Sequence, residues 1–114
     1  MPPIVLLVVS SQRRSRLLEI LEGRALRIEC AAGFLDAREK LGGSARYALL
    51  IVDAELHDGS WQDLMQFARH SGTAAAGIVC ARLGDHQLWA EVVESGAYDL
   101  ITEPYEQQEV TRII

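Results

Sequence analysis

Residues 47–53 read Tyr-Ala-Leu-Leu-Ile-Val-Asp, an apolar run that ends in a carboxylate. Such a run, without polar alternation, is typical of a strand that is covered on both faces of a sheet. Ile4–Val9 is a second run of this kind, and Gly77–Ala81 is a shorter one. We therefore predict buried strands at these three places, with Asp53 at the carboxyl end of one of them.

Helical patterns alternate with the strands from end to end. A weaker edge strand is predicted at Ala25–Cys30 and a last strand at Tyr98–Thr102. The first predicted helix is Ser11–Leu21, and the second bears Phe34, Ala37 and Leu41. The third is capped by Ser60 and has four apolar residues on one face: Trp61, Leu64, Met65 and Ala68. A fourth helix begins at Asp85, and a last one starts at Glu106–Ile114. This order predicts an α/β fold of five βα units with a parallel sheet, helices on both faces and a truncated last helix.

Length and composition indicate one globular domain over residues 1–114, which we expect to be the N-terminal regulatory piece of a longer protein. The net charge of −5 argues against nucleic-acid binding, and no apolar run is long enough to cross a bilayer. Cys30 and Cys80 both fall within predicted strands, as buried thiols in a reducing compartment would. We expect a cytoplasmic protein in which these two cysteines form no disulfide.

The carboxyl ends of parallel strands are where ligands and catalytic groups gather in open α/β sheets. The residues predicted at these ends are Ser10 and Ser11 after the first strand, Asp53 after the third, Ala81 and Arg82 after the fourth, and Glu103 and Pro104 after the fifth.

Two segments carry a resemblance to a known family. Leu49–Asp53, with Asp58-Gly59 shortly after, resembles the acceptor strand of bacterial response-regulator receiver domains, and Gly96–Tyr105 resembles their closing motif. The resemblance covers the whole chain and implies the flavodoxin-like strand order 2-1-3-4-5. It also implies that Asp53 stands where the family has its phosphoacceptor aspartate.

The other site positions depart from the family pattern. Ser10 and Ser11 replace the acidic pair that holds Mg²⁺, and Ala81 replaces a hydroxyl residue at the end of the fourth strand. Glu103 stands before Pro104 in place of a lysine, and Leu100 occupies the aromatic switch position. The resemblance is therefore to a degenerate receiver.

These departures remove the physical basis of metal-dependent phosphoryl transfer. Mg²⁺ requires oxygen ligands and is usually held by one or two carboxylates, and the serines leave Asp53 as the one full negative charge among the expected ligands. The change from lysine to Glu103 reverses a charge near a phosphoryl group, which costs about 4–7 kcal/mol before screening at roughly 5–8 Å and an effective dielectric of about 20. We expect no bound Mg²⁺, no other metal and no enzymatic activity.

Asp53 has three interpretations from sequence. It is a strand-end carboxylate that caps the following loop, or a residual acceptor for phosphate, or one half of an ion pair. For the third interpretation Arg82 and Arg13 are the candidate partners, since each is placed close to the predicted strand ends.

The sequence favours a non-catalytic signalling module that acts through protein contacts. The alternative is a true phosphoacceptor, phosphorylated on Asp53 by a histidine kinase and regulating an output domain such as a transcription activator. The expected partner is a histidine kinase, an attached output domain or a second copy. Self-association is expected through the fourth helix, fifth strand and fifth helix, a face that carries Trp89, Val93, Tyr98 and Tyr105.

Overall fold

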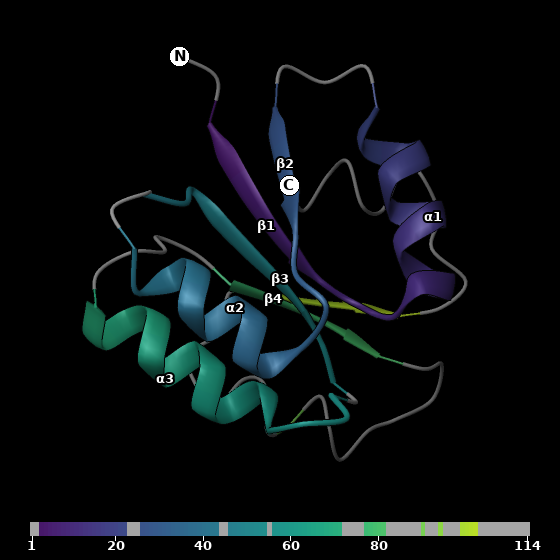
Figure 1. The fold of residues 1–114 in the computed structure, drawn as a ribbon. Coiled ribbons are helices and arrows are strands. Elements are labelled where there is room, and N and C mark those ends of the chain that lie inside the picture. The colour runs from purple at the N-terminus through teal and green to yellow at the C-terminus, as the bar shows by residue number, and fades with distance from the viewer. Residues whose placement is uncertain are drawn as a thin grey trace.

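The computed structural model describes residues 3–22, 26–43, 46–54, 56–71, 77–81, 90, 94 and 99–102. They form a parallel sheet of five strands in the order β2-β1-β3-β4-β5, with helices packed on it (Figure 1). The strand order predicted from sequence is confirmed. The elements run β1 Ile4–Val8, α1 Ser11–Leu21, β2 Arg27–Cys30, α2 Phe34–Leu41, β3 Leu49–Asp53, α3 Trp61–Ser71, β4 Gly77–Ala81 and β5 Asp99–Thr102.

Among the described residues, three strand boundaries differ from the sequence prediction. β1 ends at Val8 rather than Val9. β2 begins at Arg27 rather than Ala25, and β3 begins at Leu49 rather than Tyr47. The Ala48 N–H donates to the carbonyl of Ile4 at 2.8 Å, so the chain joins the sheet at this point before the regular ladder begins. The predicted helices that start at Asp85 and Glu106 lie outside the described residues, apart from the single positions 90 and 94.

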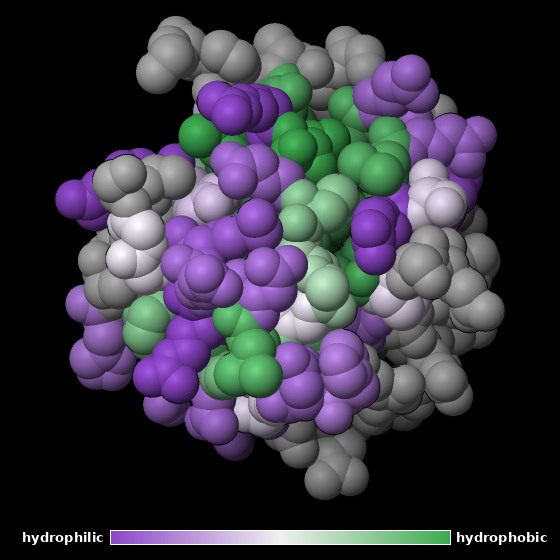
Figure 2. Space-filling view, viewed as in Figure 1, coloured by the Kyte–Doolittle hydropathy of each residue, from purple (hydrophilic) through white to green (hydrophobic). Residues whose placement is uncertain are grey.

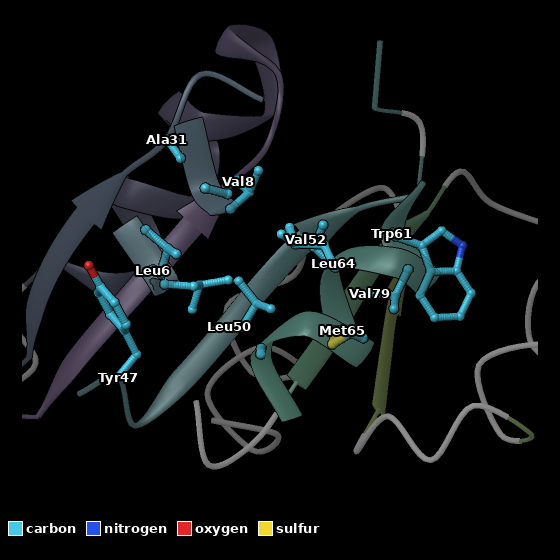
Figure 3. Packing of buried hydrophobic residues seen from close by; sticks show 13 residues of the cluster. Leu6, Val8, Ala31, Tyr47, Leu50, Val52, Trp61, Leu64, Met65 and Val79 are labelled. Atoms are coloured by element: carbon cyan, nitrogen blue, oxygen red, sulfur yellow. The ribbon is translucent and has the colours of Figure 1, made fainter. Parts of the chain in front are cut away.

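Helices cover both faces of the sheet, and each face has its own core. Leu6 and Val8 of β1 point toward α2 and α3, while Val5 and Leu7 point toward α1. This alternation follows from the two-residue period of a strand. Figure 3 shows the larger core, where side chains from β1, β3 and β4 meet those of α3.

The cap predicted for α3 is confirmed. The Asp63 N–H donates to the Ser60 hydroxyl oxygen at 3.1 Å, which satisfies one of the free N–H groups of the first turn. The predicted apolar face is confirmed as well, because its four residues are all buried: Trp61, Leu64, Met65 and Ala68.

Cys30 and Cys80 are both free thiols, as predicted, but only Cys80 is buried and Cys30 is half-buried. They lie on β2 and β4, and β1 and β3 stand between these two strands. Within the described part of the chain, no helix has the length and hydrophobicity needed to cross a membrane.

Candidate functional site

The carboxyl ends of the strands lie together along one border of the sheet. This carboxyl edge runs across the ends of the strands and is distinct from the outer strands β2 and β5. Val8 of β1 pairs with Val52 of β3, and Asp53 is the next and last residue of β3. Asp53 in turn pairs with Cys80 of β4, and the last residues of β4 and β5, Ala81 and Thr102, pair with each other. The predicted strand-end positions 10, 53 and 81 therefore belong to the same edge, where sites form in open parallel sheets.

Asp53 is the one buried charged residue among those the structure describes, with 2% of its surface exposed. Its Oδ2 accepts a long hydrogen bond of 3.4 Å from the N–H of Ser10, at the end of β1. On the other side, the Ala54 N–H donates to the Cys80 carbonyl at 2.9 Å and fixes the chain as it leaves β3. A buried charge needs polar partners, and the Ser10 N–H is one such partner for the Asp53 carboxylate.

Ser10 and Ser11 stand at the start of α1, where sequence placed them. α1 begins at Ser11, and the N–H of Arg14 donates to the Ser10 carbonyl at 2.8 Å as the first turn closes. Ser10 therefore occupies the N-cap position of α1. It is exposed, and its N–H lies next to the Asp53 carboxylate.

Several predicted site residues are placed only in part or not at all. Arg13 lies in α1, and Ala81 and Leu100 lie in β4 and β5, but only their backbone is described. Outside the described residues lie Arg82, Trp89, Val93, Tyr98, Glu103, Pro104 and Tyr105. The proposed ion pair between Asp53 and Arg82 or Arg13 therefore stays a prediction.

The donors that the structure describes at this edge fit Mg²⁺ poorly. Among the residues that the structure describes, no three His, Cys, Asp or Glu side chains come together in a group that could hold a metal ion. Asp53 is buried and already accepts an N–H, and its neighbour Ser10 is neutral. A hard divalent cation prefers several oxygen ligands, usually including one or two carboxylates.

A second carboxylate has a structural role that the sequence did not reveal. The carboxylate of Asp58, in the loop after β3, accepts the N–H of Phe34 at 2.7 Å and the N–H of Leu35 at 3.1 Å. These two groups open α2, whose own N-cap residue, Gly33, makes no side-chain cap. Asp58 therefore caps α2 from a different loop, and we call this contact the Asp58 clamp.

Glycines allow the two loops of the Asp58 clamp to approach. A Cβ at Gly33 would lie 2.7 Å from His57 and 2.8 Å from the Asp58 carboxylate, and a Cβ at Gly59 would collide with the Phe34 side chain. The one sequence signal near the clamp is the Asp58-Gly59 pair, which enters the resemblance to receiver domains. The partner could not be found, because Phe34 lies 24 residues earlier in the chain.

The Asp58 clamp should make stability depend on pH. The hydrogen bonds donated by the backbone N–H groups of Leu35 and Phe34, with the larger effect from Leu35, hold the pKa of Asp58 below its ordinary value of 3.8. The clamp's contribution is then complete above that value and is lost as pH falls through the lower pKa of the folded state. In thermal melts from about pH 6 to about pH 2.5, Asp58→Asn should show a smaller loss of melting temperature on acidification than the parent. At neutral pH its melting temperature should be about 5 °C lower, because the amide has one acceptor oxygen for the two N–H groups that the carboxylate binds.

Glu39→Gln is the matched control, since it neutralises an exposed carboxylate on α2, the helix that Asp58 caps. It should leave both the melting temperature and its dependence on pH close to those of the parent. Equal acid sensitivity in Asp58→Asn and the parent would contradict the role given to the clamp.

No protein-family model matches the chain, and no curated protein sequence matches it. Solved structures do match in fold. The signal receiver domain of an HD domain-containing protein from Pseudomonas fluorescens superimposes with a TM-score of 0.86 at 22% identity, covering 99% of this chain and 91% of that one. The receiver domain of a putative LuxO repressor protein from Vibrio parahaemolyticus gives 0.85 at 22% identity, over 98% and 86%.

A third similar structure is the receiver domain of a sensor histidine kinase from Pseudomonas aeruginosa, with a magnesium ion coordinated in its active-site cleft. Its TM-score is 0.81 at 18% identity, over 99% of this chain and 94% of that one. The chain therefore has the flavodoxin-like fold of receiver domains over nearly its whole length, as the sequence motifs predicted.

Proposed function

We propose that this chain is a degenerate receiver, a cytoplasmic signalling module that acts by protein contact and does not take part in phosphoryl transfer. The observation that carries the proposal is the environment of Asp53 at the carboxyl ends of the strands. Its carboxylate is buried, accepts the Ser10 N–H and has an uncharged serine beside it at the end of β1.

Phosphoryl transfer to a carboxylate depends on positioning and on positive charge around the transferred group. The sequence puts Ser10 and Ser11 where two metal-binding carboxylates would be needed, and Glu103 where a lysine would stabilise the added charge. The proposal therefore includes the absence of Mg²⁺ binding and of any enzymatic activity. The partners in this role are a histidine kinase, an attached output domain or another copy of the chain.

The second candidate is a true phosphoacceptor. Asp53 favours it, because this carboxylate ends the central strand β3 in the fold that receiver domains share. Under this alternative a histidine kinase phosphorylates Asp53 and the modified module regulates an output domain.

Treatment with acetyl phosphate and Mg²⁺ separates the two candidates. We expect no mass increase of one phosphoryl group on the intact chain, and no fluorescence change of the tryptophans on titration with Mg²⁺ and beryllofluoride. A stoichiometric phosphoryl adduct that Asp53→Asn abolishes would establish the acceptor function instead.

A repaired variant serves as the positive control for this assay. Ser10→Asp, Ser11→Asp and Glu103→Lys together return the missing carboxylates and the missing cation. The repaired chain should bind Mg²⁺ more tightly than the parent, and any adduct it forms should again depend on Asp53.

A further inference from the structure

β2 forms an outer edge of the sheet, and half of its backbone groups face away from it. The N–H of Arg27 donates to the Pro3 carbonyl and the N–H of Ala31 donates to the Leu7 carbonyl, each at 2.9 Å. In a β-ladder, the backbone N–H and C=O groups of every second residue bond to one neighbouring strand, and those of the residues between them point to the opposite side. The N–H and C=O groups of Ile28 and Cys30 therefore point outward, and such an edge can accept another strand.

The side chains of β2 divide sharply between the two faces of the sheet. Ile28 and Cys30 of β2, and Leu26 just before it, are half-buried and pack against the core beneath α1. Glu29 lies on the other face, where its carboxylate accepts the Tyr47 hydroxyl at 3.3 Å. Arg27 has the same parity as Glu29 and is exposed, so the charged pair is on one face and the apolar set on the other.

A groove runs between β2 and α1 on the apolar face. It has a volume of about 560 Å³ and is lined by Ser15, Leu18, Glu19, Glu22 and Ile28. Figure 2 shows hydrophobic surface over β2 and the adjoining side of α1, with hydrophilic residues around it. An apolar groove beside an open strand edge suits an added strand that carries apolar side chains on one face.

We propose that this edge is covered by a second copy of the same chain, with the two β2 strands antiparallel and centred on Ile28. This register sets Ile28 opposite its own counterpart, with both outward N–H groups donating across the pair. Leu26 then stands opposite Cys30 of the other copy. Arg27 stands opposite Glu29 of the other copy, and the two-fold axis repeats this pairing of opposite charges.

Charge decides between this register and its neighbour. Centring the strands on Glu29 would set the two Glu29 carboxylates directly opposite each other, and like charges in that position are unfavourable. Centring on Ile28 replaces this repulsion by two Arg27–Glu29 attractions. The side chains of Leu26, Ile28 and Cys30 from both copies then continue the apolar layer from one sheet into the next.

The charges of α1 point to the same arrangement. Its first half carries Arg13, Arg14 and Arg16, its second half carries Glu19, and Glu22 follows directly after its last residue, which is the reverse of what the helix dipole favours. A two-fold axis perpendicular to the sheet keeps both α1 helices on one face and makes them antiparallel. The basic half of each helix is then placed alongside the acidic half of the other.

The pairing can be tested by sedimentation of the 114-residue chain over a range of concentrations. We expect a reversible monomer–dimer equilibrium whose dissociation constant rises about tenfold in Arg27→Glu and in Glu29→Arg. The two substitutions together should return it to within about threefold of the parent. Glu39→Arg, a charge reversal on α2 away from the edge, is the control and should leave it unchanged.

Crosslinking tests the register itself. In a Cys30→Ser background, Ile28→Cys should form a disulfide-linked dimer on mild oxidation, because the two introduced thiols face each other across the axis. Glu29→Cys in the same background should not, since its counterpart lies two residues away along the strand. Circular dichroism melts show whether each variant folds. If a charge-reversal variant does not fold, the crosslinking of Ile28→Cys compared with Glu29→Cys decides whether the proposed pairing is correct.

Three results would overturn the proposal. The first is a parent chain that stays monomeric up to about 1 mM. The second is a dimer that Arg27→Glu does not weaken. The third is crosslinking through position 29 in preference to position 28. The pairing selects a second copy from the partners named in the proposed function, but it does not depend on the chemistry of Asp53. β2 lies at the opposite edge of the sheet from β5, and the acetyl phosphate assay can therefore fail or succeed independently of the sedimentation experiment.

Discussion

Replacing Leu50 by alanine should lower the free energy of unfolding by about 3–5 kcal/mol. Leu50 lies in β3, the middle strand of the sheet, and its side chain is completely buried in the core shared with α2 and α3 (Figure 3). The strand is flanked on both sides, so the backbone cannot collapse into the space that the lost methyl groups leave. The cost is then the lost burial together with that of a residual cavity.

Urea unfolding followed by circular dichroism measures this effect. Leu35→Ala is the matched control, since Leu35 is also a leucine but is 65% exposed, and its substitution should change stability by about 0.5 kcal/mol or less. A loss below about 1 kcal/mol for Leu50→Ala would mean that the core under α2 and α3 is not packed as described.

Gly59→Ala should destabilise the chain by about 1–3 kcal/mol. The added Cβ would collide with the Cβ and ring of Phe34, the first residue of α2. Phe34 cannot move away freely, because its N–H is held by the Asp58 clamp. Relief of the overlap must therefore displace either the start of α2 or the loop after β3.

Gly43→Ala provides the comparison for this prediction. A Cβ there meets only the Lys40 carbonyl oxygen at 3.4 Å, and Gly43 is exposed beyond the end of α2. It should be close to neutral in the same unfolding experiment. Equal stabilities for the two alanine variants would show that the loops are not in the close contact that the Asp58 clamp requires.

Much of the fold could be predicted from local patterns. The apolar runs at Ile4–Val9 and Tyr47–Val52 gave the buried strands, and Ser60 with Asp63 gave the start of α3, because these signals lie within a few residues of each other. The position of Asp53 at a strand end also followed from its own run. Strand order came from the resemblance to receiver domains, since strand pairing is not encoded locally.

The parts that could not be predicted depend on contacts between distant segments. The Asp58 clamp joins residues 24 positions apart, and the hydrogen bond between Ser10 and Asp53 joins residues 43 positions apart. Which residues of β2 face its edge depends on the hydrogen bonds of Arg27 and Ala31 to β1. The sequence alone indicated an edge strand but not this register.

The order of the strands has a consequence for how the molecule can be made. Once β1 and β2 have paired, each later strand joins beside β1 or beside the strand that preceded it in the chain. No later strand has to insert between two that are already paired. Assembly can thus keep pace with translation, because each new strand finds its neighbour in the sheet already in place when it leaves the ribosome.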